Sequence, residues 1–442
     1  MGDPVNESAR PLRLRRRVRR RAHRCVRRAA IWTLRPLRWR RRVPPPGDRP
    51  RVRVLLQNAH GAGGTIRTVL NLCGYLARDH DVEIVSVLKR SRKPFFPLPP
   101  GVAVTYADDG LARKNRTARL LARLPSVLTP VDEASFRHMS LWTDVRLLRA
   151  LYAAPADVLI GTRPSLVLLA AELGPRGVAT IGQDHMNLGS YRPALRRQVV
   201  RAYRRLTALA ALTEEARADY ARALAGSGVR VAAIPNAAPP LPEPPSRREH
   251  DVVLAAGRLV RAKGFDLLLR AYVPIAAEHP GWTLRVFGSG VRRDRLRALV
   301  ADLGLTGRVE LRGKTPDLPA EMRRASIHVL PSRREGMPMV VIEAMGMGLP
   351  VVAFDCPHGP AELITSGADG LLVPAGDVEA LTAALRKLIT DPGLRDRLGE
   401  EALRSARRHD LGHIGPRWSR LIAAAITDGR TGMAALIPKF RK

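Results

Sequence analysis

Short runs of apolar residues alternate with longer segments of helical spacing along most of the chain. The first run, Arg51–Gln57, is followed by a glycine-rich turn and by Ile66–Ala77, which has one apolar face. Further strand-like runs in the first half are Val82–Val87, Val102–Tyr106, Val158–Gly161, Thr180–Gln183, Ala208–Leu212 and Arg230–Ile234. The second half has its own set, Val252–Ala256, Leu284–Phe287, Val309–Leu311, Ile327–Leu330, Val351–Phe354 and Leu371–Val373. This alternation predicts an α/β protein with two sets of β–α units, each forming a parallel sheet covered by helices.

Proline-rich segments mark the expected boundaries between these sets. Pro44–Pro46 with Gly47 ends a basic N-terminal segment, and Pro239–Pro245 forms a turn or hinge after Asn236. A last helical pattern lies near Pro416–Ile426. The predicted organisation is a basic arm (1–49), a first α/β domain (50–236), a second α/β domain (237–415), and a C-terminal helix with a basic tail (416–442).

The composition indicates a soluble intracellular enzyme. With 442 residues, 45% of them hydrophobic, the chain is long enough for two domains with complete cores. It has no run of about eighteen apolar residues that would cross a membrane. Its N-terminal apolar stretch, Ala29–Leu34, is too short for a signal peptide. The cysteines Cys25, Cys73 and Cys356 form no close pair, which argues against a disulfide framework or a zinc site.

Arginine dominates the charge of the chain. The formal net charge is +35, and 67 of the 75 basic residues are arginine. A GC-rich genome accounts for part of this bias, but it does not by itself deplete acidic residues. An anionic partner is therefore expected.

Residues 10–42 form a dense arginine run that also contains apolar residues, among them Trp32 and Trp39. One interpretation is a disordered, solvated arm. The other is a helix lying on an anionic membrane surface, with the two tryptophans seven residues apart on one face. Nucleic acid also fits the charge, but only 4% of the chain is aromatic and no nucleic-acid motif is present, so it is not the expected partner.

Two glutamates frame the expected loop and helix of the segment Leu330–Glu343. Pro331 and Ser332 end a strand, Gly336 and Pro338 shape a tight loop, and a helical pattern begins at Met339. Glu335 lies in the loop, and Glu343 is expected about two turns inside the helix. Carboxylates near the free N–H groups of a helix start suit a ligand rich in hydroxyls. The pattern therefore predicts a sugar-binding site.

Arg258 and Lys263 follow strand Val252–Ala256 and its Gly257 turn. Two fixed cations after a strand suit a ligand with phosphate groups, because arginine can fork onto two oxygens and lysine supplies a point charge. No pair of aspartates is placed as a metal site, so neither a metal nor a cofactor is expected.

In the first domain, two loops follow strands at their carboxyl ends. Gly61–Gly64 lies between the first strand and its helix, where Gly63 and Gly64 would allow close approach to a ligand. His185, flanked by Asp184 and Asn187, follows the strand Thr180–Gln183. A lone histidine is more often satisfied by local contacts, but this segment is unusually polar after an apolar strand.

Five further blocks accompany the two glutamates in a fixed order. These are LAAGRLVRAKGFD from Leu254, RVFGSG from Arg285, VELRG from Val309, FDCPHGPAELI from Phe354 and DGLLVPAGD from Asp369. Together with the E-x7-E pair they resemble the retaining, nucleotide-sugar-dependent glycosyltransferases of family 4. The wording of the FDCPHGP block is most similar to bacterial envelope-polysaccharide transferases of the amylovoran galactosyltransferase type.

The resemblance implies the GT-B fold, two Rossmann-like domains facing across a cleft, with the last helix packing back on the first domain. It places Glu335 on the donor sugar and Glu343 on the ribose. It places His185 against the donor sugar or the leaving phosphate. His358 either contacts the donor phosphates or caps a loop. The resemblance implies further donor-binding residues at Gly63, Gly64, Asn236, Gly288, Gly336, Met337, Pro338 and Met339.

The expected function is retaining transfer of a hexose from a nucleotide sugar, with UDP the expected nucleotide, to an envelope or lipid-linked glycan. The expected location is the cytoplasmic face of the membrane, where the protein would be peripheral. Two alternatives stay open. One is a glycosyltransferase acting on a soluble acceptor, and the other is a non-catalytic basic adaptor with the same fold.

Overall fold

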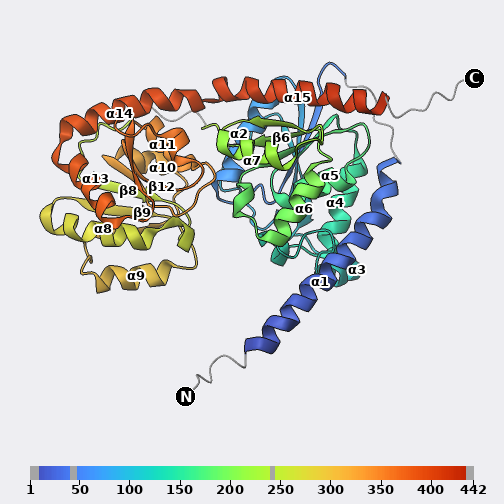
Figure 1. The fold of residues 1–442 in the computed structure, drawn as a ribbon, viewed down its shortest axis with the longest axis horizontal. Coiled ribbons are helices and arrows are strands. Elements are labelled where there is room, and N and C mark those ends of the chain that lie inside the picture. Colours follow the sequence, from blue (N-terminus) through green and yellow to red (C-terminus); the bar gives the residue numbers. More distant parts are fainter. Residues whose placement is uncertain (1–8, 40–46, 239–243, 435–442) are drawn as a thin grey trace, which may run out of the picture. The chain divides into compact units, whose positions relative to one another are not determined.

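The computed structural model describes residues 9–39, 47–238 and 244–434 (Figure 1). The predicted boundary at Pro44–Pro46 and most of the predicted hinge Pro239–Pro245 lie outside these residues. The chain divides into two compact units. Unit 1 contains the chain up to Ala211, Arg217–Ala232 and the chain from Trp418, and unit 2 contains Leu212–Ala216 and Ala233–Arg417.

Unit 1 is built on a seven-stranded sheet of order β3-β2-β1-β4-β5-β6-β7. In chain order the strands are β1 (Arg51–Leu56), β2 (Asp81–Lys89), β3 (Val102–Asp109), β4 (Val158–Gly161), β5 (Ala179–Asp184), β6 (Ala208–Ala211) and β7 (Arg230–Ala233). Pairing from β3 to β6 is parallel, and Val54 lies opposite both Ile84 and Ile160. The strand order reverses between β1 and β4, which opens the carboxyl edge of the sheet to a ligand.

Helices follow the strands of unit 1. They are α2 (Gly64–Leu76), α3 (Arg116–Arg123), α4 (Leu141–Ala153), α5 (Pro164–Leu173), α6 (Pro193–Tyr203) and α7 (Glu214–Ala223), with 3-10 turns η3 (Ala134–His138) and η4 (Leu188–Ser190). The last helix, α15 (Leu411–Ala434), begins earlier than predicted and contains Pro416. Its residues from Trp418 onward belong to unit 1, where Asp428 pairs with Arg230 at 3.0 Å.

Unit 2 is built on a six-stranded parallel sheet of order β10-β9-β8-β11-β12-β13. Its strands are β8 (Val252–Ala256), β9 (Thr283–Phe287), β10 (Val309–Gly313), β11 (Ile327–Leu330), β12 (Val351–Asp355) and β13 (Gly370–Pro374). Its helices are α8 (Phe265–Glu278), α9 (Arg293–Asp302), α10 (Leu318–Arg323), α11 (Met339–Gly346), α12 (Pro360–Leu363), α13 (Val378–Thr390) and α14 (Pro392–Ala406), with η5 (Arg261–Lys263) and η6 (Arg407–His409).

Both faces of the unit 2 sheet are buried. Val253 and Val329 belong to one apolar cluster, whereas the neighbouring Leu254 and Leu330 belong to another. Successive side chains of a strand point to opposite faces, so a parallel strand covered on both sides must be apolar throughout. The strands could be predicted from the sequence for this reason. The predicted α/β class with two parallel, Rossmann-like sheets is confirmed.

The N-terminal segment is a helix packed on unit 1. α1 (Ala9–Leu34) continues into the 3-10 turn η2 (Arg35–Trp39). Arg27 is 5% exposed and pairs with Glu172 of α5 at 2.5 Å, and Ile31 is buried in the unit 1 core. The expectation of a disordered arm is therefore wrong for residues 9–39, because these contacts order the segment.

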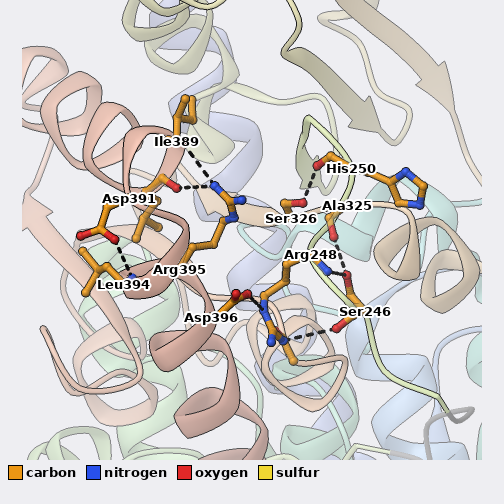
Figure 2. A network of polar contacts seen from close by, with 12 residues as sticks. Ser246, Arg248, His250, Ala325, Ser326, Ile389, Asp391, Leu394, Arg395 and Asp396 are labelled. Carbon is orange, nitrogen blue, oxygen red and sulfur yellow. Dashed lines mark hydrogen bonds and ion pairs between the residues drawn. The ribbon is translucent and has the colours of Figure 1, made fainter.

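Arg248 fastens the segment entering unit 2 to two helices (Figure 2). Its Nε donates to Asp396 of α14 at 2.8 Å, and its Nη1 donates to the carbonyl oxygen of Gly348, just after α11, at 3.0 Å. Arg248 has a positive φ of 59°. Ser246 adds a hydrogen bond from its hydroxyl to the Ala325 carbonyl at 2.6 Å. These bonds hold the start of β8 against the C-terminal part of the unit.

We predict that Arg248→Ala lowers the free energy of unfolding of unit 2 by about 1.5–3 kcal/mol, because it removes charge-assisted hydrogen bonds from a mostly buried side chain. Denaturant unfolding measures the change. The matched control is Arg386→Ala, which removes an exposed pair with Glu278 and should lower the free energy of unfolding much less, because solvent screens that pair. Equal losses in the two variants would contradict this account.

Candidate active site

Four loops of unit 2 follow β8, β9, β11 and β12 at the carboxyl edge of the sheet. They comprise residues 257–264, 288–292, 331–338 and 356–359. Carboxyl ends of parallel strands share one edge, so the predicted site residues of this unit are brought to the same side. The four loops together are called the loop cluster below.

Glycines allow these loops to touch through their backbones. A Cβ at Gly264 would overlap the Pro331 carbonyl, one at Gly288 the Gly257 carbonyl, and one at Gly359 the Gly336 carbonyl. Gly264, Gly288 and Gly359 also have positive φ values of 64°, 146° and 116°, which side chains rarely adopt. Gly288 was expected to leave room for a nucleotide. The structure gives this glycine a different reason, because it lies against the loop after β8.

Lys263 and Glu335 form an ion pair within the loop cluster. The Glu335 side chain is 8% exposed, and it also accepts a hydrogen bond from the Ser332 hydroxyl at 2.5 Å. The pair joins the cation predicted for the phosphate to the carboxylate predicted for the sugar. Arg258 is exposed. A ligand reaching this pair would meet a cation and an anion in fixed relative positions.

A second ion pair joins the loop after β11 to the first turn of α8. Arg333 donates to both carboxylate oxygens of Asp266, at 2.7 and 2.8 Å, and its backbone N–H donates to the Ala262 carbonyl at 2.8 Å. Burial raises the pKa of Asp266, but the hydrogen bonds and charge of Arg333 outweigh burial, and the pKa is lowered overall. Asp266 is therefore ionised at neutral pH. This pair was not predicted, although the sequence places an acidic residue three positions after Lys263 and a basic residue two positions before Glu335.

α11 carries the second predicted carboxylate. Glu343 is 4% exposed and is the fifth residue of the helix, about one turn from its start, not two as predicted. Pro338 is the N-cap residue of α11, and the side chains of Met337 and Met339 are buried in the core. Only the backbone of these methionines is therefore presented by the loop.

Asn236 is attached to the loop that carries Glu335. Its side-chain Nδ2 donates to the Met337 carbonyl at 3.2 Å, and its backbone N–H contacts the Met337 sulfur at 3.2 Å. Asn236 is 3% exposed. The structure thus brings Asn236 to the loop cluster, as a residue that holds the Met337 backbone.

His358 lies in the loop after β12, next to Gly359, with a positive φ of 63°. Its Nδ1 lies 3.1 Å from a carboxylate oxygen of Glu215 at the start of α7. Glu362 accepts hydrogen bonds from the backbone N–H groups of Glu214 and Glu215, at 3.0 and 3.2 Å. Glu362 of α12 therefore caps the backbone N–H groups of Glu214 and Glu215, which belong to unit 2 like α12 itself.

In unit 1, a buried polar cluster lies at the carboxyl end of β5. Asp184 is 1% exposed and accepts hydrogen bonds from Tyr191, Tyr220 and the Met186 backbone. Burial raises its pKa to about 6 despite these bonds. Burial also lowers the pKa of His185 to about 4, so its imidazole is neutral at pH 7. A neutral ring can donate one hydrogen bond and accept another.

The glycine loop of unit 1 leads into α2. Gly63 is the N-cap residue, with φ 149° and no neighbouring atom within 4 Å of the place a Cβ would take, and Gly64 begins the helix. The open space is compatible with a bound ligand. Asn187 is buried and immediately precedes η4, and its carbonyl accepts from the Ser190 hydroxyl at 2.7 Å.

The described residues contain no group of three or more His, Cys, Asp or Glu placed to hold a metal ion. Within the same part of the chain, no helix is long and apolar enough to cross a membrane.

Residues 242–405, which include the whole loop cluster, match the family model described as glycosyl transferases group 1. The chain belongs to this glycosyltransferase family. Its E-x7-E pair, Glu335 and Glu343, lies inside the matched segment, as do Arg258 and Lys263.

Two relatives illustrate the range of this family. An exopolysaccharide phosphotransferase of Streptomyces coelicolor is 37% identical over 381 residues, covering 83% of this chain. The chain spans only 40% of the length of that protein. The amylovoran biosynthesis glycosyltransferase AmsD of Erwinia amylovora is 26% identical, with 84% of this chain and 98% of AmsD covered.

The fold has solved counterparts. TarM of Staphylococcus aureus, crystallised in complex with fondaparinux, α-GlcNAc-glycerol and UDP, superposes with a TM-score of 0.68. The likeness covers 84% of this chain and 99% of TarM at 14% identity. It supports the GT-B fold of this glycosyltransferase.

We predict that Arg333→Ala loosens the loop at residues 331–338 in this glycosyltransferase. Losing the paired hydrogen bonds to Asp266 should raise amide hydrogen exchange there about tenfold, with β8 unchanged. The exposed neighbour Arg334→Ala is the matched control and should have little effect. The exchanged pair Asp266→Arg with Arg333→Asp should recover part of the protection. An Arg333→Ala loop as protected as the wild type would refute the role of this pair.

We predict that His185 titrates near pH 4, because burial opposes its protonation. NMR of the protein labelled at histidine measures this, with His185→Gln assigning the signal. The neutral form is favoured on folding, so stability is present above the ordinary value of 6.5 and is lost as the pH falls towards 4. A His185 signal titrating at 6.5 or above would contradict the burial argument.

Proposed function

We propose that this protein is a retaining glycosyltransferase that moves a hexose from a nucleotide sugar, with UDP the expected nucleotide, to an envelope or lipid-linked glycan. The observation that carries the proposal is the Lys263–Glu335 pair in the loop cluster of a group 1 glycosyltransferase domain. The UDP in the TarM crystals and the polysaccharide named for AmsD support the choice of donor and acceptor class.

The ion pair suggests how donor binding would redistribute charge. When a diphosphate enters, Lys263 turns from Glu335 towards phosphate, and Arg258, which is exposed, adds a second cation. Glu335 is then left to accept hydrogen bonds from sugar hydroxyls, held by Ser332. Charge-assisted hydrogen bonds of this kind are strong and depend on geometry. The fixed loops therefore place both charges before the donor arrives.

The proposed reaction follows from these placements. The bond between the sugar and the diphosphate breaks, and the acceptor hydroxyl forms its bond on the same face of the sugar. The acceptor proton passes to the departing diphosphate oxygen, whose growing charge Arg258 and Lys263 stabilise. We assign Glu343 to the ribose hydroxyls. His185, as a neutral imidazole, is assigned to the donor sugar or leaving phosphate.

The acceptor defines where the protein works. An exopolysaccharide or lipid-linked glycan is assembled at the membrane, so we place the protein peripherally at the cytoplasmic face. A soluble acceptor is the first alternative, and a non-catalytic adaptor is the second. A non-catalytic adaptor would not need Lys263, Arg258 and Glu335 on neighbouring loops together with Glu343 in the helix that follows.

A donor screen tests the proposal. The protein is incubated with UDP-, GDP- and ADP-sugars, with EDTA and separately with Mg²⁺, and thermal shift and donor hydrolysis are measured. One donor should stabilise the protein and be slowly hydrolysed. Glu335→Gln, Glu343→Gln and Arg258→Ala should each weaken this response about ten- to hundredfold, because each removes a charged hydrogen-bonding group.

Glu400→Gln is the matched control, since Glu400 is an exposed glutamate of α14, and it should leave the response unchanged. A folded protein that responds to no donor would favour the adaptor. A response that survives in Glu343→Gln and Arg258→Ala would overturn the assignment of the site.

A further inference from the structure

α1 has two distinct faces, and over residues 17–34 the described part of the chain covers only one of them. Exposure along the helix repeats with helical period: Arg20, His23, Arg27 and Ile31 are buried or half-buried on one side. Val18, Cys25 and Trp32 are exposed and lie seven residues apart, which keeps them on a common opposite side. The side that contains Val18, Cys25 and Trp32, together with the exposed Trp39 of η2, is called the outer face.

The covered face fixes α1 to unit 1. Arg27 donates from Nε to the Leu128 carbonyl at 2.7 Å in addition to its pair with Glu172. His23 Nε2 contacts the Ser126 carbonyl at 2.8 Å. A buried ion pair with additional hydrogen bonds is stable only in a narrow range of geometries. The helix is therefore a fixture of unit 1, and whatever the outer face binds is held in a set orientation to that unit.

η2 extends this attachment. Arg38 donates from Nε to the Gly174 carbonyl at 2.9 Å, and its own carbonyl accepts from the Arg176 backbone at 3.0 Å. The Arg176 guanidinium stacks over the ring of Trp39. Trp39 is thus oriented by unit 1 although much of its surface remains exposed.

The outer face combines large apolar groups with positive charge. Val18 is 58% exposed, Trp32 74% and Trp39 72%. The sequence of α1 contains eleven arginines and no acidic residue, and Arg17, Arg21 and Arg28 are exposed beside the apolar stripe. Tryptophan favours the boundary between lipid tails and headgroups, and arginine favours anionic headgroups.

We infer that the outer face of α1 and η2 binds the surface of an anionic bilayer, with Val18, Trp32 and Trp39 at the level of the headgroups. This inference rests on the proposed function, in which the acceptor lies at the membrane. It identifies the part of the protein surface that contacts the membrane. A second copy of this helix is disfavoured as the partner, since two acid-free arginine helices repel. Nucleic acid would use the arginines but leaves the apolar stripe without a role.

Cys25 provides a probe on the outer face. It is exposed, whereas Cys73 and Cys356 are buried, so an environment-sensitive dye reacts at Cys25. The full chain labelled in this way is mixed with vesicles of phosphatidylglycerol and phosphatidylethanolamine, and with vesicles of phosphatidylcholine alone. The dye should shift to the blue, and the protein should sediment, with the anionic vesicles only, and binding should weaken as salt is raised. Cys25→Ser controls for labelling elsewhere.

Trp32→Ser should weaken vesicle binding about tenfold or more, since a large apolar side chain no longer leaves water. Leu111→Ser, which alters an exposed leucine of unit 1 outside α1, is the matched control and should bind as the wild type does. Both variants should give the wild-type thermal shift with donor, because neither residue belongs to the loop cluster.

The outcomes separate this inference from the proposed function. If the protein binds vesicles but responds to no donor, the membrane-binding role of the outer face is supported and the proposed glycosyltransferase function is contradicted. If the protein responds to a donor but does not bind vesicles, only the membrane-binding role of the outer face is contradicted. Equal binding to neutral vesicles, a dye response to duplex oligonucleotide in place of vesicles, or self-association that hides Cys25 would each also overturn the inference.

Discussion

Backbone contact between neighbouring loops is the constraint on which the candidate site depends. Gly264, Gly288 and Gly359 let one loop lie against the carbonyl of the next, and any side chain there would separate them. Lys263 and Glu335 lie in loops that follow different strands, β8 and β11. They form an ion pair because these two loops touch. The charges are thus placed by the fold before a ligand binds, which lowers the cost of organising them during a reaction.

Two ion pairs join the loop after β11 to the segment that follows β8, and their environments suit different roles. Arg333 donates two parallel hydrogen bonds to Asp266 in the first turn of α8 and a further one to the Arg261 carbonyl, so both side chains are held by the protein. Lysine is a compact point charge that changes partners more readily than a paired guanidinium. Lys263–Glu335 is therefore suited to open towards a ligand, while Asp266–Arg333 keeps the loops together.

α1 shows how one sequence pattern can serve two surfaces. A run of arginines is usually a solvated segment, but here Arg27 is buried against Glu172 while Arg21 and Arg28 on the other side are exposed. Arg27 can be buried because Glu172 balances its charge and its donors have hydrogen-bond acceptors. The remaining arginines then lie beside an apolar stripe whose direction is set by the docked side.

The sequence by itself determined the strands, the order of the β–α units and the family, because a strand buried on both faces must be apolar and the family blocks are local. It also marked Glu335, Glu343, Arg258 and Lys263. Only the tertiary structure decided that Lys263 and Glu335 pair, that Asp266 binds Arg333, and that α1 docks through Arg27. These contacts join residues far apart in the chain, and pairing between distant residues depends on how the loops pack, which no local pattern records.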